Sequence, residues 1–593
     1  MKRNKTHIFI ITIFFVIITV FIGCNDEFLT HEPQGQFSDS SISNADGVEG
    51  ILLSAYKMLN GLGLDGQSAW NNDVQSWVFG GIPSDDALKG TDAGDQPEQS
   101  FLETYNFQTF NGHITNKWRG LYKGVARTND AINSVMNLEN SEISEERKEQ
   151  IIAEARFLRG FFHFEARKMW RMPPYIDETN FDRNNIESTK VPNDKEIWPM
   201  IEADFEAAAA ILPETQGEVG RPTKWAAKAF LAKAKMYQGW DEQGNPNTAK
   251  LQEAKDILND IVELQRYSLA QTFEENFLVA TRNNQESIFE IQYAISSSND
   301  QASNQGVGLA HPYTDPWGCC GFYQASQNLV NSFKTENGLP MLENFNNEDV
   351  SFEITTDSLS AYIKPLDPRI DHTLGRPGIL FKDFKLHQLD FIRDVSYAGP
   401  YSSKKHVAEP EAFGIGGWAN LSANNYRIMR YGMILLWLAE CEVEIGSLDR
   451  AEALVNKIRE RSANPNGFVP KAIQGKDRND FSIVEGEAAA NYDIKPYPTG
   501  TFSNKGKDFA RNAVRFESRL EFAMEGHRFF DLQRWGISAK VLNSYLQSES
   551  KYRTYLEGIS FTPNKNEFYP IPIQAIDRSY KEGQPTLTQD PAY

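Results

Sequence analysis

The stretch MRYGMILLWLAECEVEIGSLDRAEALVNKIRER, residues 429–461, carries the pattern that decides the fold. Apolar side chains recur at steps of three and four on both sides of Gly446, which places each set on one face of a helix. The glycine supplies a turn between the two helices. The stretch therefore predicts an antiparallel helix pair. Its two apolar stripes are Met429, Met433, Leu436, Ala439 and Val443, then Ala451, Leu454, Val455 and Ile458.

Three further segments repeat this design. Residues 225–239 and 251–264 predict a second helix pair, and residues 151–169 predict a helix that Pro173 ends. Such pairs of about thirty residues resemble degenerate tetratricopeptide units, although the strict repeat signature is absent. The predicted fold class is mostly α, with a tetratricopeptide-like scaffold of helical hairpins. The apolar positions are Ala229, Ala232, Met236, Ala254, Ile257, Leu258 and Ile261, with Ile151, Ala155, Leu158, Phe162, Ala166 and Met169 in the first helix.

Between residues 270 and 425 this periodicity disappears. The segment is rich in Asn, Gly, Pro and aromatic residues, and only short pieces such as residues 287–293 are strand-like. We expect a large loop-rich, short-strand face laid on the helices, where ligands would bind. No Pro/Ser/Gly-rich linker divides the 593 residues, so residues 24–593 are expected to form one domain with this loop-rich insertion.

The N-terminus predicts a lipoprotein signal peptide over residues 1–23. Lys2, Arg3 and Lys5 precede an apolar segment, residues 8–22, and a lone cysteine, Cys24, follows Gly23. This segment, at about 1.5 Å per residue, is too short to cross a hydrocarbon core of about 30 Å. Lipidation of Cys24 would attach the chain to a membrane. The alternative is an ordinary signal peptide that is cleaved near the same place.

Composition excludes several kinds of partner and site. The net charge of −20 argues against nucleic acid, because such binders need clustered Lys and Arg. Nine scattered histidines contain no His-x-x-x-His pair, so we expect no metal site and no cofactor. Cys319 and Cys320 are adjacent, and two alternatives stay open: a disulfide that makes a rigid apolar platform, or two buried thiols.

Catalytic patterns are weak, and we expect no catalytic residue and no enzyme activity. Residues 61–66 match G-x-G-x-x-G, but a helix rather than a strand is expected before them, so they predict a turn. Glu517, Glu521 and Glu525 share a helical face, as paired catalytic carboxylates can. Because Arg519, Arg528 and Arg534 are interleaved with them, an ion-pair network is the better interpretation.

Recognition is the chemistry that remains. Residues 312–324, PYTDPWGCCGFYQ, place aromatic rings among turn formers, so some rings should lie at the surface. Flat rings beside polar groups suit sugars, whose C–H faces stack on aromatic faces while their hydroxyls need hydrogen-bond partners. A second cluster of tryptophans and carboxylates lies in an irregular early stretch. The alternative is that the tryptophans belong to the core. The candidate ligand-binding residues from both clusters are Trp70, Trp77, Asp85, Asp86, Trp317, Cys320 and Tyr323.

A series of motifs, in this order, resembles the SusD/RagB family of surface lipoproteins from Cys24 to the C-terminus. Single motifs are weak, and the C-terminal ones match best. They are Ser84-Asp85-Asp86-Ala87; Trp118, Tyr122, Arg127 and Asn129; residues 155–160; the helix from Arg430 to Glu440; residues 456–461; Glu517-Ser518-Arg519; Glu525-Gly526-His527-Arg528; residues 531–535; Tyr569-Pro570-Ile571-Pro572; and residues 589–593.

This resemblance implies a binding protein on the outer membrane, lipid-anchored and facing the cell exterior. Such proteins cover a TonB-dependent transporter of the SusC type and pass it oligosaccharides or, in some branches, peptides. The resemblance implies that the early and central loops build the ligand face together. It also places Arg376 and Tyr401 near the ligand, although a salt bridge of Arg376 to a neighbouring Asp explains that residue equally well. The alternatives are a helical-repeat surface adaptor, which a buried Trp317 together with an apolar concave helical face would favour, and a peptide-binding member of the family.

Overall fold

The computed structural model describes residues 44–62, 69–138, 143–295, 302–354, 359–360, 362–416 and 419–593. The expected signal peptide and Cys24 lie outside these ranges, as do residues 63–66 of the glycine-rich turn. Gly61 is described: its φ of +78° ends the 3-10 turn Lys57–Asn60 that follows helix α4 (Ala45–Tyr56). The prediction that a helix precedes this glycine is confirmed, and a dinucleotide-binding strand is excluded there.

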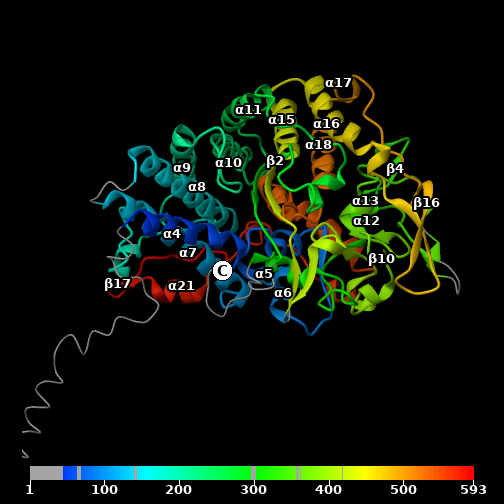
Figure 1. The fold of residues 1–593 in the computed structure, drawn as a ribbon, viewed down its shortest axis with the longest axis horizontal. Coiled ribbons are helices and arrows are strands. Elements are labelled where there is room, and N and C mark those ends of the chain that lie inside the picture. The colour runs from blue at the N-terminus through cyan, green and yellow to red at the C-terminus, as the bar shows by residue number, and fades with distance from the viewer. Residues whose placement is uncertain are drawn as a thin grey trace, which may run out of the picture.

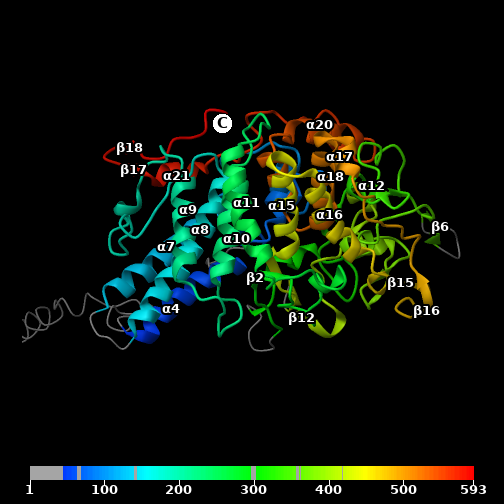
Figure 2. The same ribbon diagram turned by 90° about the horizontal axis from the view of Figure 1, so that it is seen from above.

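Helices form a row across the molecule (Figure 1). Successive members pack on each other from α7 through α11, and α11 packs on α15. Figure 2 shows α8, α10, α11, α15 and α16 side by side. The scaffold is therefore mostly α and built of stacked helical hairpins, as predicted. The long helices are α7 (Gly112–Met136), α8 (Glu145–Met169), α9 (Trp198–Ile211), α10 (Lys224–Met236), α11 (Thr248–Glu263), α15 (Tyr431–Ile445), α16 (Leu448–Ser462), α18 (Lys507–Phe522) and α20 (Ser538–Glu549).

The hairpin predicted from residues 429–461 is confirmed as α15 and α16. Ser447 begins the second helix as its N-cap, since its side chain accepts a hydrogen bond from the backbone N–H of Arg450. One detail of the prediction is wrong. Met429 belongs to strand β14 (Tyr426–Arg430), because its backbone pairs with Phe289 of strand β2 (Ser287–Ile291). The strand at residues 287–293 was predicted, and the structure ends it at Ile291.

The region from 270 to 425 consists of loops, short helices and short strands, as predicted. The strands described in the molecule form antiparallel pairs. The pairs are β1 (Ala87–Gly90) with β3 (Phe322–Ala325), β4 (Thr335–Glu336) with β5 (Leu339–Pro340), β6 (Glu353–Ile354) with β7 (Leu359–Ser360), β8 (Leu374–Gly375) with β11 (Ser402–Ser403), β9 (Leu380–Phe381) with β10 (Lys385–Leu386), β12 (Phe413–Gly416) with β13 (Ala419–Ser422), β15 (Pro470–Gln474) with β16 (Phe481–Ala488), and β17 (Tyr580–Lys581) with β18 (Gln584–Pro585).

Short helices link these strands and the long helices. They are α5 (Ala69–Asn72), α6 (Pro97–Glu103), α12 (Gln327–Ser332), α13 (Ile370–Thr373), α14 (Val395–Ala398), α17 (Thr501–Lys505), α19 (Arg528–Arg534) and α21 (Ile573–Arg578). Among the described residues, no helix has the length and apolar content that crossing a membrane would require.

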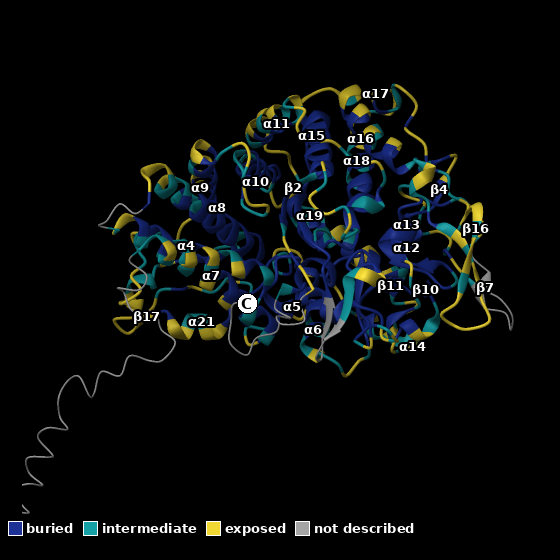
Figure 3. Ribbon diagram, in the orientation of Figure 1, coloured by how far each residue is buried: buried dark blue, intermediate teal, exposed yellow. Residues whose placement is uncertain are grey.

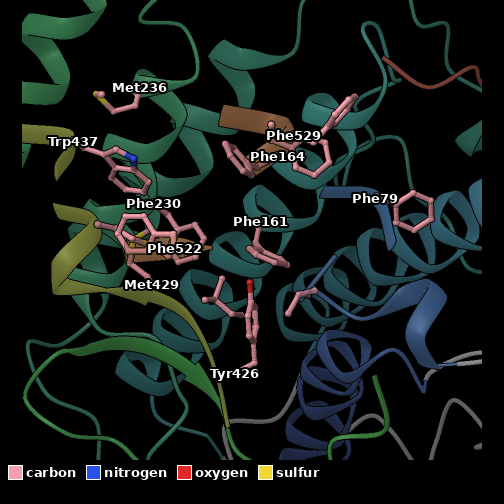
Figure 4. Packing of buried hydrophobic residues seen from close by; sticks show 14 of the residues in the cluster. Phe79, Phe161, Phe164, Phe230, Met236, Tyr426, Met429, Trp437, Phe522 and Phe529 are labelled. Atoms are coloured by element: carbon pink, nitrogen blue, oxygen red, sulfur yellow. The ribbon is translucent and has the colours of Figure 1, made fainter. Parts of the chain in front are cut away.

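The hydrophobic core runs through the helix row and continues into the loop-rich part (Figure 3). Phe230 of α10 packs edge-to-face on Phe157 and Phe161 of α8, with ring centroids 5.2 and 5.7 Å apart. Figure 4 shows Met429 and Phe522 near Phe230, so strand β14 and the end of α18 enter the same cluster. Aromatic rings thus join the first helices to the C-terminal ones.

Glu517, Glu521 and Glu525 form an ion-pair network, as expected, but their partners are not the arginines that the sequence suggested. Glu521 is fully buried and contacts Arg369, Arg430 and Arg461. Burial opposes ionisation, yet these guanidiniums hold its pKa far below the ordinary value. The remaining pairs are Glu517 with Arg369 and Arg459, and Glu525 with Arg430 and Lys405. The expected arginines bind elsewhere: Arg534 binds Glu440, and Arg519 and Arg528 bind early residues of the chain.

Candidate functional site on the loop face

The early and central loops meet, as the resemblance implied. Strand β1 pairs with β3, with Ala87 opposite Ala325 and Gly90 opposite Phe322. The ring of Trp77 lies 5.5 Å from that of Tyr323, and its Nε1 donates a hydrogen bond of 2.8 Å to the carbonyl oxygen of Gly306. Residues more than 220 positions apart therefore form one structural unit.

The rings expected at the surface of this unit are buried, which corrects the prediction. The exposed fractions are 7% for Trp70, 0% for Trp77, 1% for Trp317, 0% for Tyr323 and 2% for Tyr401. A large ring gains more from packing than from partial exposure to water. None of these five rings offers a face to a ligand in this structure.

Trp317 shows the reason for this burial. Its ring lies 5.3 Å from Phe381, 4.9 Å from Phe384 and 5.0 Å from Phe391, in a small apolar cluster of its own. The backbone N–H groups of Trp317 and Gly318 both donate to the carbonyl oxygen of Thr314. Trp317 therefore anchors the loop that precedes it.

The predicted charged residues are also buried and paired. Arg528 binds Asp85 through two hydrogen bonds of 2.7 and 2.9 Å, and Arg519 binds Asp86 at 2.9 Å. Burial alone raises the pKa of Asp85, but the two guanidiniums outweigh it and lower this pKa to about 2. Arg376 forms a bidentate pair with Asp371 at 2.7 and 2.6 Å. Asp85, Asp86 and Arg376 tie loops to the scaffold and, because they are buried, are not accessible to a ligand.

Cys319 and Cys320 form a disulfide, so of the two alternatives the structure has the bonded one. Cys320 is buried and belongs to the main hydrophobic core, and Cys319 packs against the same core. The pair lies between Gly318 and Gly321 in the loop before β3. It supports this loop from beneath and exposes no broad apolar platform.

One aromatic residue of residues 312–324 does lie at the surface. Tyr313 is 42% exposed, and its backbone N–H donates to the carbonyl oxygen of Phe391. The guanidinium of Arg393 lies over its ring, with Cζ 5.4 Å from the centroid. Gly321 lies beneath both residues, since a Cβ there would come within 3.7 Å of Tyr313 Cβ and of the Arg393 backbone nitrogen.

The loop after β1 supplies carboxylates to this place. Arg393 Nε lies 2.9 Å from Asp92 Oδ2, and its NH1 lies 2.7 Å from Asp95 Oδ2. The same NH1 lies 3.3 Å from Thr91 Oγ1. All three charged side chains are partly exposed to solvent. We call Thr91, Asp92, Asp95, Tyr313 and Arg393 the loop-face cluster.

The backbone holds this loop in an uncommon conformation. Thr91 has φ +54°, which is rare for a β-branched residue, and its N–H donates to the carbonyl oxygen of Gly321 at 2.6 Å. Buried Lys89 donates to the carbonyl oxygens of Asp92 and Asp95, both at 2.7 Å. Burial lowers the pKa of Lys89. Such over-determined backbone positions gather at binding sites.

The loop-face cluster combines a flat exposed ring, a guanidinium with its donors, two carboxylates and a hydroxyl. This combination can stack a flat ligand and bind several hydroxyl groups at its edge. The described residues hold no group of three or more His, Cys, Asp or Glu side chains placed to bind a metal.

The sequence indicated the loop that carries Tyr313 but not the residues that contact its ring. The signal for them was the run Gly90-Thr91-Asp92-Ala93-Gly94-Asp95, a glycine- and aspartate-rich turn directly after a strand. Arg393 carries no comparable signal. Only the fold brings it back to Tyr313.

Two family models match the chain. The SusD family model matches residues 285–593, and the model described as starch-binding associating with outer membrane matches residues 90–236. A SusD-like protein of Bacteroides ovatus is 27% identical over 275 residues, 46% of this chain. That match spans about half of the relative, 48% of its length.

Solved structures share the fold over nearly the whole chain. A SusD superfamily protein from Bacteroides vulgatus has a TM-score of 0.66 at 20% identity, covering 93% of this chain and 100% of that one. Surface glycan-binding protein A from Bacteroides thetaiotaomicron, in complex with laminarihexaose, has a TM-score of 0.60 at 20% identity, covering 92% and 99%. At such identities the likeness establishes the fold.

Proposed function

This chain belongs to the SusD family, and from that premise we propose that it binds an oligosaccharide at the loop-face cluster on the cell surface. The observation that carries the proposal is the exposed ring of Tyr313 beside Arg393, Asp92 and Asp95. The ring offers a stacking face, and the charged groups offer donors and acceptors to sugar hydroxyls. The solved relative in complex with laminarihexaose supports a sugar as the ligand class.

The proposal includes delivery to a partner. The protein would hand its ligand to a TonB-dependent transporter of the SusC type in the outer membrane, to which a lipid on Cys24 would attach it. The match to a family described as associating with outer membrane supports this location. Residues 24–593 would act as one domain, which the continuous core from Val48 to Leu587 supports.

We propose binding without catalysis. The paired carboxylates that most resemble a catalytic set, those of Glu517 and Glu521, are fully buried and bound to arginines. Neither carboxylate is free to act as an acid or a base on a bound sugar. The protein should therefore leave its ligand intact.

Affinity electrophoresis through gels that contain soluble starch or laminarin tests the proposal. We expect at least one polysaccharide to slow the wild type, and Tyr313→Ala and Arg393→Ala to migrate faster than it. Tyr580→Ala is the matched control, because Tyr580 is equally exposed, 48%, on the distant β17–β18 hairpin. If Tyr313→Ala is slowed as much as the wild type, the loop-face cluster is not the site.

A surface adaptor is the second candidate, and two observations favour it. Trp317 is buried, and an apolar groove of about 550 Å³ runs between α7 and α21. Trp118, Tyr122 and Phe181 line this groove. Detergent-solubilised complexes decide between the two candidates. The adaptor requires a partner that the substitution Tyr122→Ala releases, whereas the glycan proposal requires polysaccharide retardation.

A further inference from the structure

A second cavity lies on the helical side of the molecule, far from the loop-face cluster. It has a volume of about 370 Å³ between the start of α9, the loop after α10, helix α19 and residues 564–568. Figure 3 places α9 at the upper left and α14, which follows Arg393, at the lower right. A cavity of this size accommodates a small ligand.

Two polar atoms in this cavity lack partners. Trp240 is 6% exposed, and its Nε1 donor has no hydrogen-bond partner. Glu567 is half-buried, and its Oε2 acceptor has none either. A buried donor without a partner destabilises the protein, so a ligand oxygen that accepts from this N–H would relieve that cost.

The charges around the cavity select the ligand. Its cations are already paired: Arg167 with Glu196 at 2.8 Å, Lys168 with Glu165 at 2.7 Å, and Arg534 with Glu440 at 2.7 Å. The other charged groups of the lining, Asp241, Glu242 and Glu567, are all carboxyl groups, so the surplus charge around the cavity is negative. Such a site favours hydroxyl donors and disfavours carboxylates.

We propose that this cavity, lined by Trp198, Tyr237, Trp240 and Glu567, binds a neutral sugar unit as a second glycan site. The Trp240 N–H donates to one ring or hydroxyl oxygen, and Glu567 accepts from a neighbouring hydroxyl. Trp198 and Tyr237 line the cavity beside the sugar and present it with their edges, because Arg167 and Arg534 lie over their rings at 5.3 and 5.9 Å. The choice of a sugar rests on the proposed function, whereas the position of the site rests on the cavity itself.

Saturation-transfer NMR tests this inference on the full chain in detergent, with glucose, galactose, mannose and glucuronate as probes. The protein used carries both Tyr313→Ala and Arg393→Ala, so that binding at the loop-face cluster is removed; this double variant is the background for the further substitutions. We expect a neutral sugar to give transfer, and Trp240→Phe and Glu567→Gln each to weaken binding about fivefold or more. Glucuronate should bind more weakly than the neutral sugars.

Trp225→Phe is the matched control, because Trp225 of α10 also has an unpartnered buried Nε1 but does not line the cavity. It should leave the transfer unchanged. The inference is overturned if no neutral sugar gives transfer in this background, if Trp240→Phe and Glu567→Gln bind like the background, or if Trp225→Phe weakens binding equally. If polysaccharide gels slow the wild type but no sugar gives saturation transfer in this variant, the second site is wrong and the proposed site at the loop-face cluster is unaffected.

Discussion

The guanidinium of Arg393 covers the ring of Tyr313 from 5.4 Å while it binds Asp92 and Asp95 at 2.9 and 2.7 Å. Three loops that are far apart in the sequence are joined by this one side chain. The ring is thereby held in place without being buried. Because little flexibility has to be lost on binding, such an arrangement favours a ligand that stacks on the ring.

Tyr313→Ala should weaken glycan binding about two- to tenfold. Stacking on one ring contributes about 0.5–1.5 kcal/mol, and 1.4 kcal/mol corresponds to a factor of ten in Kd. Calorimetric titration with the polysaccharide found by gel retardation measures the change. The melting temperature should stay within about 2 °C of wild type, because an exposed ring contributes little to the core. Unchanged affinity would remove Tyr313 from the site.

Trp317→Ala should destabilise the protein by about 3–5 kcal/mol, the usual cost of deleting a buried Trp side chain. The residue packs among Phe381, Phe384 and Phe391, and it anchors the loop that carries Tyr313. Chemical denaturation measures the loss, and Trp317→Phe should lose less. A fully stable Trp317→Ala protein with weakened binding would contradict the anchoring role and return Trp317 to the ligand site.

Asp85→Asn should lower the free energy of unfolding by about 3–5 kcal/mol, because Asp85 is buried and its loss leaves the partly buried Arg528 without its charge partner. The pKa of Asp85 is lowered from 3.8 to about 2. The contribution of this carboxylate to the free energy of unfolding is therefore complete above pH 3.8 and is lost as the pH falls towards 2. Urea unfolding at pH 7 and pH 3 measures both effects. Glu487→Gln, which breaks the exposed pair with Lys471, should cost under about 1 kcal/mol.

Glu103→Gln should make the protein more stable at pH 8 than wild type. Burial raises the pKa of Glu103 from 4.5 to about 7, so the folded state binds the proton more tightly than the unfolded state. Its contribution to the free energy of unfolding therefore falls as the pH rises from 4.5 to 7, by up to about 3 kcal/mol.

Thermal melts of wild type and Glu103→Gln between about pH 4.5 and about pH 8 give the difference in stability between the two proteins, which should shrink towards pH 4.5. Glu149→Gln, on the exposed side of α8, is the control and should show no such trend. A difference that is constant with pH would mean that Glu103 is ionised in the folded protein throughout.

Cys24→Ala should release the protein from the outer membrane. The sequence predicts that this thiol carries the lipid, and each buried methylene contributes about 0.8 kcal/mol to the anchor. Membrane flotation and labelling with palmitate measure the loss. If the variant stays with the membranes after a high-salt wash, another group attaches the chain.

Much of the fold could be predicted because helical periodicity is a local property. The stripes on either side of Gly446 gave α15 and α16 nearly to their ends, and the loss of period after residue 270 gave the loop-rich part. Met429 was misplaced because an apolar residue at the right spacing fits a helix or a strand equally well. Its pairing with Phe289 of β2, which the spacing does not reveal, makes it a strand residue.

The ligand site was predicted less well, for a physical reason. Trp77, Trp317 and Tyr323 are aromatic residues in irregular segments, and the sequence does not tell whether such a ring meets water or other rings. Phe381, Phe384 and Phe391, more than sixty positions later, cover Trp317. Tyr313, four residues before it, has the guanidinium of Arg393 over its ring and stays exposed to solvent.

The sequence by itself determined the helical scaffold and the family resemblance, because apolar spacing and short motifs are encoded within a few turns of chain. The tertiary structure alone decided which charges and rings reach the surface. Arg528 is bound to the buried Asp85, whereas Arg393, paired with Asp92 and Asp95, lies at the surface beside Tyr313. Pairing and burial depend on contacts across hundreds of residues, and desolvation favours the pairing of buried charges. The groups left over at the surface are what the protein can offer to a ligand.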